Sequence, residues 1–327
     1  MRIFFFCVML ALALPAASQP AAQPYGERSE VQAFIADLVQ RHGFTESELQ
    51  QLFSKVQRTD PVLQFMTPAE RPTWQDYRAM FVNEARIAAG LAFWKANRRA
   101  LARAEREYGV PAQFIVAIIG VETYYGRNMG RWRVIDALST LAFDYPSRAP
   151  FFRGELEQYL LLAREGGLDV FALRGSYAGA IGIPQFMPGS LRRYGVDFDG
   201  DGAIDLRRSS VDAVGSVANF LKEHGWRAGE PVIYRARVTN DAARKYVDGS
   251  VTPKYPVGEL IAGGLELHPA PASTEALGVL VALGEDHRVG LQNFWVITRY
   301  NRSAFYATVV SDLAAALAER RAQSAGK

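Results

Sequence analysis

One carboxylate of the sequence stands in an apolar setting that suits acid chemistry. Glu122 follows Ile115, Ile118 and Ile119 at helical spacing, so the four side chains share one face of a predicted helix. Burial among apolar side chains disfavours the charged form of a carboxyl and raises its pKa. An acid that is still protonated near neutral pH can protonate a leaving-group oxygen. The alternative is a structural carboxylate at the edge of the core, paired with an arginine or reaching solvent.

A second group of carboxylates has the spacing of a calcium-binding loop. Asp197, Asp199 and Asp201 occupy its first, third and fifth positions, where oxygen ligands are needed. Gly202 permits the sharp turn, and the carbonyl of Ala203 is a further candidate ligand.

The loop departs from that pattern at its twelfth position. Arg208 stands where a bidentate Glu is usual, so we expect the missing ligand to come from Asp212, which opens the next predicted helix. The alternative is an acidic surface turn without an ion. We expect a structural Ca²⁺ at this loop and no cofactor for catalysis.

Ser176 and Gln185 lie in two glycine-rich segments around residues 175 to 188. Small residues allow a ligand to approach the backbone closely, and the two polar side chains could bind that ligand or orient Glu122. A plain turn is the structural alternative.

Helical periodicity dominates the segments that would position these residues. Apolar spacing predicts helix over 28–56, 74–108, 134–142, 151–165, 210–223 and 303–321, with a further helix starting at Val110-Pro111. Pro61 and the segment 68–72 interrupt the pattern.

The pattern changes after Gly229. Val232, Tyr234, Ala236 and Val238 alternate with other residues as in a strand, and 277–283 and 294–298 are predicted to be strands or buried extended segments. The fold class predicted is mainly α with a small β-rich part (α+β).

The first residues have the pattern of a secretory signal peptide. Arg2 precedes the uncharged apolar run Ile3–Leu14, and Ala16-Ala17-Ser18 offers small residues for cleavage. The run is shorter than the roughly 20 residues of a membrane span, and the alternative is a buried N-terminal helix. Cys7, the single cysteine, lies inside the run, so we expect a mature chain without disulfides, thiol nucleophile or lipid anchor.

Charge excludes one class of partner. The chain has 37 Lys and Arg against 34 Asp and Glu, which provides no strong basic field for nucleic acid.

Six segments resemble one known family, the B-type lytic murein transglycosylases. In order they are Ile118-Ile-Gly-Val-Glu-Thr, Asp136-Ala-Leu-Ser-Thr-Leu-Ala-Phe, Gly175-Ser-Tyr-Ala-Gly-Ala, Pro184-Gln-Phe-Met-Pro, Asp197-Phe-Asp-Gly-Asp-Gly and Thr298-Arg-Tyr-Asn. The resemblance covers nearly the whole mature chain and implies a lysozyme-like core. We therefore expect a signal peptide at 1–18, a helical domain at 27–100 with the C-terminal helix 303–325, a catalytic core at 101–226 with the loop 197–212, and a small β-rich domain at 227–302.

The resemblance also implies a reaction. Glu122 would protonate the oxygen between N-acetylmuramic acid and N-acetylglucosamine, and then accept the proton of the muramic C6 hydroxyl, which closes onto C1 as a 1,6-anhydro end. One residue would serve as acid and then base, whereas most glycoside hydrolases use two carboxylates.

Further site residues are implied by the same resemblance. Ser176 and Gln185 would hold acetamido groups, and the other expected substrate contacts are Tyr77, Tyr145, Arg148, Tyr300, Asn301 and Tyr306. Arg148 could pair with a carboxylate of the stem peptide. The family often has Tyr where this chain has Phe220, so one hydroxyl near the site is absent.

Two other functions remain open at this point. A hydrolytic muramidase or chitinase-like enzyme could use the same fold, and a peptidoglycan-binding protein without activity is the second alternative. The partners expected are peptidoglycan glycan strands and unspecified cell-wall synthesis proteins, with a monomer acting in the periplasm.

Overall fold

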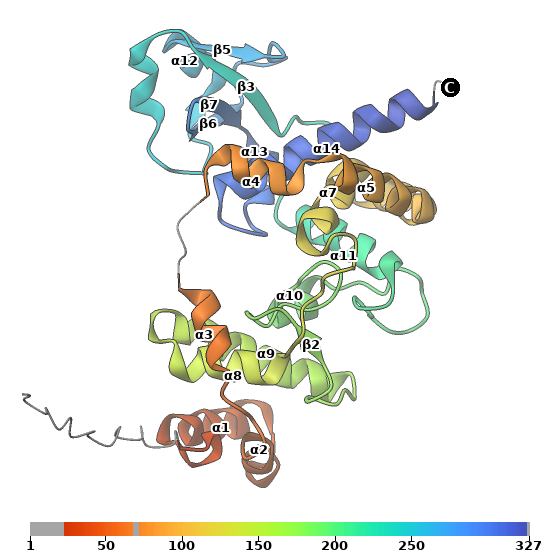
Figure 1. Ribbon diagram of the computed structural model, residues 1–327, viewed down its shortest axis with the longest axis vertical. Coiled ribbons are helices and arrows are strands. Elements are labelled where there is room, and N and C mark those ends of the chain that lie inside the picture. The colour runs from red at the N-terminus through yellow and green to blue at the C-terminus, as the bar shows by residue number, and fades with distance from the viewer. Residues whose placement is uncertain (1–22, 68–71, 326–327) are drawn as a thin grey trace, which may run out of the picture. The chain divides into compact units, whose positions relative to one another are not determined.

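The computed structural model describes residues 23–67 and 72–325 (Figure 1). The predicted signal peptide and Cys7 lie outside these residues. The chain divides into two compact units, residues 1–57 and residues 58–327.

The first unit is a small helical body. It contains η1 (Tyr25–Glu27), α1 (Ser29–His42) and α2 (Glu46–Phe53). Gly43 takes a left-handed conformation that ends α1, and the Thr45 side chain accepts a hydrogen bond from the Glu48 amide at the start of α2. The rings of Phe34 and Phe53 meet edge to face in the core between the helices.

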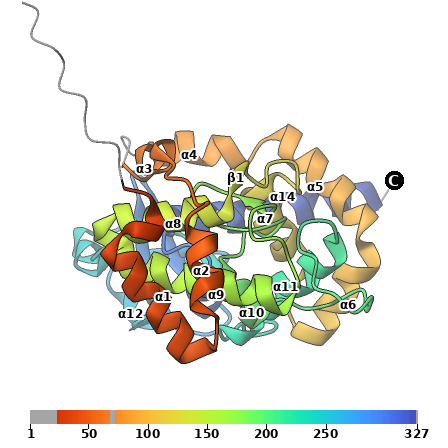
Figure 2. The ribbon, with the colours of Figure 1, turned by 90° about the horizontal axis from the view of Figure 1, so that it is seen from below.

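The second unit is mainly helical. Its longer helices are α3 (Asp60–Met66), α4 (Trp74–Phe81), α5 (Glu84–Ala96), α6 (Arg98–Tyr108), α7 (Ala112–Thr123), α8 (Val134–Asp144), α9 (Ala149–Glu165), α10 (Pro188–Tyr194), α11 (Ser210–Glu223) and α14 (Ala304–Ala325). The short 3-10 turn η2 (Pro146–Arg148) joins α8 to α9, and Figure 2 shows these two helices side by side.

Three helix predictions differ from the structure. The stretch 28–56 is two helices, α1 and α2, because Gly43 ends the first. Pro61 lies in the first turn of α3, where its missing N–H costs nothing, so it begins a helix and does not interrupt one. The stretch 74–108 is three helices, because Asn83 caps α5 and Asn97 interrupts the run before α6.

Helix α7 lies at the centre of this unit. Eight of its twelve residues are buried, and its neighbours are α5, α6, α11 and α14 (Figure 1). Gly120 makes this packing possible, because a Cβ there would lie 2.6 Å from the hydroxyl of Tyr125.

An antiparallel sheet forms the β-rich part. Its strand order is β4 (Tyr255–Pro256), β6 (Leu277–Leu283), β7 (Asp286–Gly290), β3 (Ile233–Val238) and β5 (Leu265–His268). Helix α12 (Val257–Ala262) packs on it through Val257 and Leu260, and η3 (Asp241–Tyr246) contributes Tyr246 to the same apolar core. The predicted strands around 232–238 and 277–283 are confirmed.

The segment 294–298 is helical, contrary to the prediction of a strand. It belongs to α13 (Gln292–Ile297), whose Phe294, Val296 and Ile297 are all fully buried. A short apolar run buried on every side has no periodicity that separates strand from helix.

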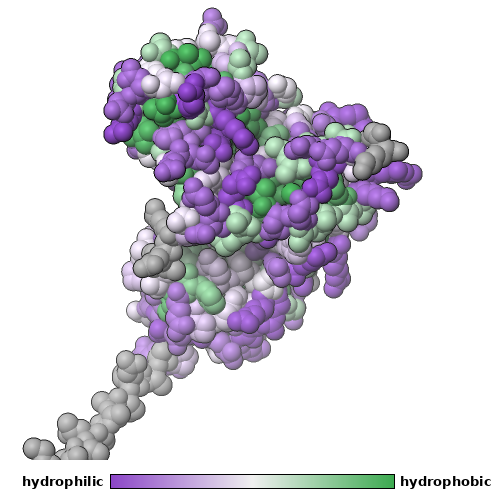
Figure 3. Space-filling view, turned by 45° about the horizontal axis from the view of Figure 1, so that its top comes forward, coloured by the Kyte–Doolittle hydropathy of each residue, from purple (hydrophilic) through white to green (hydrophobic). Residues whose placement is uncertain are grey.

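A two-stranded ribbon, β1 (Trp132–Arg133) with β2 (Arg174–Gly175), joins the loops that follow α7 and α9. Across the described residues, no helix is both long and apolar enough to cross a membrane. The face drawn in Figure 3 is largely hydrophilic, with hydrophobic side chains in separate small groups.

Candidate active site

A groove of about 890 Å³ in the second unit contains Glu122 in its wall. The other lining residues come from the segments 148–155, 176–190, 220 and 299–302. Seven of the residues singled out in the sequence line it: Glu122, Arg148, Ser176, Gln185, Phe220, Tyr300 and Asn301.

Glu122 lies in the last turn of α7, next to fully buried Ile118 and Ile119. The helix ends at Thr123, because Tyr124 and Tyr125 take left-handed conformations. Such conformations are strained for residues with a side chain and mark a locally imposed geometry. The Thr123 hydroxyl donates to the Ile183 carbonyl over 2.7 Å and accepts from the Gly126 amide over 2.9 Å, which fixes the loop beside Glu122.

The carboxyl of Glu122 has one hydrogen-bond donor among the described side chains, the hydroxyl of Tyr306 at 2.5 Å from Oε1. Burial raises the pKa of Glu122 to about 7, and the Tyr306 hydrogen bond opposes that rise because it stabilises the carboxylate. Glu122 can therefore hold a proton near neutral pH and also release it.

Tyr300 and Tyr77 complete an aromatic setting around this carboxyl. The Tyr300 ring stacks on Tyr306 with centroids 6.4 Å apart, and its hydroxyl donates to the Pro184 carbonyl over 3.0 Å. Burial, with Glu122 nearby, raises the pKa of Tyr77 to about 12. Tyr77 and Tyr306 do not line the groove, so their closeness to Glu122 points to roles behind it.

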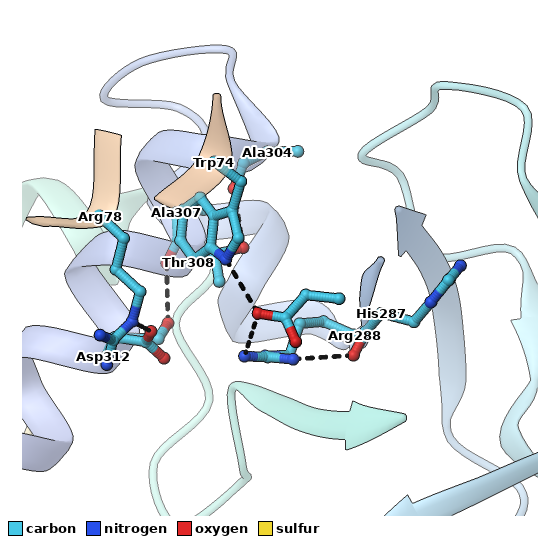
Figure 4. A network of polar contacts seen from close by, with 10 residues as sticks. Trp74, Arg78, His287, Arg288, Ala304, Ala307, Thr308 and Asp312 are labelled. Carbon is cyan, nitrogen blue, oxygen red and sulfur yellow. Dashed lines mark hydrogen bonds and ion pairs between the residues drawn. The ribbon is translucent and has the colours of Figure 1, made fainter. Parts of the chain in front are cut away.

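The first turn of α14, which carries Tyr306, is fixed by contacts with α4. Phe305 packs against the rings of Trp74 and Tyr77 of α4. The indole N–H of Trp74 donates to Asp286 of β7 over 3.0 Å, and Asp286 lies 3.5 Å from Arg288 (Figure 4). These contacts tie α14 to α4 and the sheet, and so fix the base from which Tyr306 reaches Glu122.

Ser176 and Gln185 are also engaged with the backbone. The Ser176 Oγ accepts from the amides of Ala178 and Ala180, at 3.3 and 3.0 Å. Gln185, with a φ of 52°, donates from Nε2 to the carbonyls of Met129 and Gly182. Both side chains line the groove and also hold the turns of its loops. The structural interpretation and the substrate-binding interpretation of these residues are therefore compatible.

Arg148 and Tyr145 are close in the sequence, but of the two only Arg148 lines the groove. Arg148 lines the groove with its guanidinium over the rings of Phe151 and Phe152, 4.5 and 5.2 Å from their centroids. Tyr145 packs its ring against Phe152 and is not part of the lining.

The chain matches the family model described as Transglycosylase SLT domain over residues 26–315. It is 42% identical over 313 residues to the membrane-bound lytic murein transglycosylase B of Escherichia coli, covering 91% of this chain and 85% of that protein. A solved structure of the Pseudomonas aeruginosa lytic transglycosylase SltB1 superposes with a TM-score of 0.86 at 48% identity, covering 91% of this chain and 99% of that one.

The chain belongs to the lytic transglycosylase family.

Two further solved relatives carry ligands. The E. coli transglycosylase Slt35 in complex with calcium has 42% identity and a TM-score of 0.81, with 92% of this chain and 95% of that one covered. The P. aeruginosa SltB3 in complex with NAG-anhNAM-pentapeptide has 30% identity and a TM-score of 0.77, with 90% and 79% covered.

The transglycosylase groove contains residues that the sequence analysis missed. They are Phe151, Glu155, Tyr177, Met187, Arg299 and Arg302 among others. Arg299 and Arg302 flank the predicted Tyr300-Asn301 pair, and Met187 lies within the segment 184–188, so neighbourhood in sequence was the available signal. Phe151 and Glu155 had no such signal, because α9 brings them to the groove from a helix with an ordinary amphipathic pattern.

Glu155 is the second carboxyl in the lining of the groove. Its Oε2 accepts from the Gly189 amide at the start of α10 over 2.8 Å, and burial raises its pKa. Asp136 and Asp144 of the transglycosylase are ion-paired with Arg133 and Arg58, at 2.5 and 3.7 Å. Each of these acids thus has a structural partner, whereas Glu122 has only the neutral hydroxyl of Tyr306 as its hydrogen-bond donor among the described residues.

The acidic loop brings together three of the predicted metal ligands. One carboxylate oxygen each from Asp197, Asp199 and Asp212 lies within 4.8 Å of the others. Asp201 is outside this group, and its Oδ1 accepts from the Ala203 amide. Three clustered carboxylates are the hard oxygen ligands that calcium takes, so the residues present fit the ion.

Proposed function

We propose that this transglycosylase cleaves the β-1,4 bond between N-acetylmuramic acid and N-acetylglucosamine in peptidoglycan, leaving 1,6-anhydromuramic acid ends, during cell-wall remodelling or turnover. The observation that carries the proposal is Glu122: a carboxyl in a groove wall, whose pKa burial raises to about 7 and which accepts a hydrogen bond from Tyr306.

The acid step uses the protonated form of Glu122. Its proton passes to the glycosidic oxygen as the bond to the muramic C1 breaks, and the substrate's acetamido group stabilises the positive charge that develops at C1. Because burial keeps the carboxyl protonated near neutral pH, the proton is available where a solvated glutamate would have lost it.

The base step uses the carboxylate that remains. It accepts the proton of the C6 hydroxyl while that oxygen forms the new bond to C1, so Glu122 ends protonated and no water is consumed. The Tyr306 hydroxyl, which donates to Oε1, stabilises the carboxylate between the two steps. This sequence requires one acid/base, and the other acidic residues of the groove region are engaged with backbone or arginines.

Substrate contacts follow from the lining of the groove. Ser176 and Asn301 offer polar groups for acetamido and hydroxyl contacts, and Gln185 lines the groove beside them while bonded to the Met129 and Gly182 carbonyls. The guanidinium of Arg148, which lies over the Phe151 ring, could pair with a carboxylate of a stem peptide. Tyr300, with its ring in the lining, would contact the sugar, while Tyr145 and Tyr77 would act through Phe152 and Phe305.

We further propose that a Ca²⁺ ion binds Asp197, Asp199 and Asp212, with Asp201 and the Ala203 carbonyl as added ligands. The ion would cross-link the loop to α11 and take no part in the reaction. We also propose export through a signal peptide at 1–18 and action as a monomer in the periplasm, where peptidoglycan lies.

Product analysis tests the reaction. Purified protein should release muropeptides from sacculi whose ends are lighter by one water than hydrolysed ends, as mass spectrometry shows directly. Hydrolysed ends would establish the muramidase alternative, and binding to sacculi without any soluble product would establish the non-catalytic one.

A further inference from the structure

An exposed aromatic cluster lies at one side of the groove. Phe65 of α3 is 55% exposed and Tyr177 is 39% exposed, and their rings stack with centroids 5.4 Å apart at 28°. Trp132 of β1 meets the Phe65 ring from the edge at 6.3 Å. Aromatic rings normally contribute by being buried, so a stacked pair left this open on the surface calls for a ligand.

Helix α3, which carries Phe65, is packed on α8. Helix α3 packs on α8 through Val62, which is fully buried, and the Thr59 amide donates to the Thr140 hydroxyl over 3.0 Å at its start. Phe65 lies one turn along α3 from Val62, and its half-exposed ring contacts Trp132 and Tyr177. Its exposure is therefore a fixed feature of a docked helix.

Trp132 is equally constrained. It pairs with Gly175 in the β1–β2 ribbon, and the guanidinium of Arg131 lies 5.1 Å from the centre of its ring. The next two residues after Gly175 are Ser176 and Tyr177, so the ribbon sets Trp132 and Tyr177 in a common frame.

Tyr177 connects the cluster to the groove. It lines the groove together with Ser176 and Ala178, while its ring stacks on Phe65 outside the lining. A glycan strand that left the groove on this side would pass over the ring of Tyr177 and then reach Phe65.

We propose that Phe65, Trp132 and Tyr177 form a platform for a sugar ring of the glycan strand, beyond the two sugars whose bond is cleaved. The faces of a β-1,4-linked pyranose carry C–H groups that pack on flat aromatic rings, and the hydroxyls at its edges stay in water. This suits a polymer that must bind along its length. The platform rests on the proposed function, because its ligand is the same glycan.

Binding of N-acetylglucosamine oligomers of increasing length tests the platform apart from catalysis. The background is the Glu122→Gln chain, and the probe is the tryptophan fluorescence of the protein. We expect affinity to rise with oligomer length, and Phe65→Ala to weaken binding of the longest oligomer about three- to tenfold more than that of the disaccharide. Phe65→Trp should restore the length dependence, since it returns a flat ring to the same place.

Two variants sharpen the measurement. Leu277→Ala removes a side chain that is 51% exposed on β6, and it should leave the length dependence as it was. Trp132→Phe should remove the part of the fluorescence change that appears only with long oligomers. Circular dichroism melts of each variant confirm that it is folded.

Two results would overturn the platform: a length dependence that Phe65→Ala leaves undiminished, or a long-oligomer fluorescence signal that survives Trp132→Phe. Failure of the proposed function has a different signature. In that case the wild-type chain yields no anhydro product from sacculi, whatever the oligomer titrations show.

Discussion

The carboxyl of Glu122 and the three carboxyls of the acidic loop present the same functional group in opposite surroundings. Glu122 accepts one hydrogen bond from a neutral tyrosine, in a wall built of isoleucines and aromatic rings. Asp212, which is 1% exposed, accepts from the amides of Phe198, Asp199 and Asp205. Burial alone therefore does not set the role of a carboxyl, which also depends on the groups that donate hydrogen bonds to it.

The two kinds of carboxyl therefore have different roles. A buried carboxyl that accepts three backbone hydrogen bonds, as Asp212 does, organises a loop. A buried carboxyl with one donor is left near its titration point and can exchange protons, as the pKa of about 7 for Glu122 shows. The acidic loop extends the first arrangement, with Asp197 accepting from the amides of Gly200, Asp201 and Gly202.

Removing the proton carrier is the strongest test of this contrast. Glu122→Gln should lower the rate of anhydro-muropeptide release by about a thousandfold or more, because an amide can neither donate nor recover the proton. Glu155→Gln is the matched control, since Glu155 is the other carboxyl of the groove lining but is bonded to the Gly189 amide. A loss as large for Glu155→Gln as for Glu122→Gln would indicate a two-carboxylate mechanism.

The pattern of the sequence predicts the structure best where one face of a helix or strand is buried and the other is exposed. The stripe Ile115, Ile118, Ile119 and Glu122 predicted a carboxyl in an apolar wall, which the structure confirms. The Asp spacing likewise indicated the loop, and the choice of Asp212 as a substitute ligand agrees with its place in the cluster.

What could not be predicted depends on contacts between distant segments. Tyr306 and Glu122 are 184 residues apart, and no local pattern says that their side chains meet. Helix α13 cannot be told from a strand in the sequence, because its buried run carries no periodicity. The left-handed conformations of Tyr124 and Tyr125, which end α7, are expected of glycine and have no signal in the sequence. Arg299 reached the groove only through the fold of the loop before α14.

The same Glu122→Gln change should stabilise the fold at neutral pH. The pKa of Glu122 is about 7 in the folded chain against 4.5 for an ordinary glutamate, so the unfolded state ionises more readily and burial costs stability as pH rises above 4.5. At 1.36 kcal/mol per pKa unit, the gain approaches about 3 kcal/mol above pH 7. It should disappear below pH 4.5, where both states are protonated.

Urea unfolding of both chains across that pH range measures the gain. Glu155→Gln serves as the comparison, because it removes a carboxyl that holds a backbone amide. A Glu122→Gln chain that is less stable than wild type at pH 7 would show that Glu122 is a paired, structural carboxylate.

Calcium should act on the acidic loop and leave the reaction alone. At a concentration a hundred times its Kd, the ion should add about 2.7 kcal/mol to the free energy of unfolding, seen as a higher Tm. Asp197→Ala should abolish the response, because it removes a ligand and the acceptor of three loop amides. Chelation should lower Tm without changing initial rates at moderate temperature. A wild-type Tm that does not respond to calcium would contradict the site.

The smallest expected effect concerns the single donor to Glu122. Activity requires the protonated acid, so the alkaline limb of the rate should fall at the pKa of Glu122, about 7. The Tyr306 hydroxyl stabilises the carboxylate and so lowers that pKa. Tyr306→Phe should therefore move the alkaline limb to higher pH, even as the rate at the optimum falls through loss of support for the carboxylate.

Tyr300→Phe is the matched control for this shift. Its hydroxyl donates to the Pro184 carbonyl and not to Glu122, so its removal should move the alkaline limb less than Tyr306→Phe does. Rates of anhydro-muropeptide release measured from mildly acidic to alkaline pH separate the two. If the limb moved to lower pH in Tyr306→Phe, the tyrosine would be supporting the protonated acid and not the carboxylate.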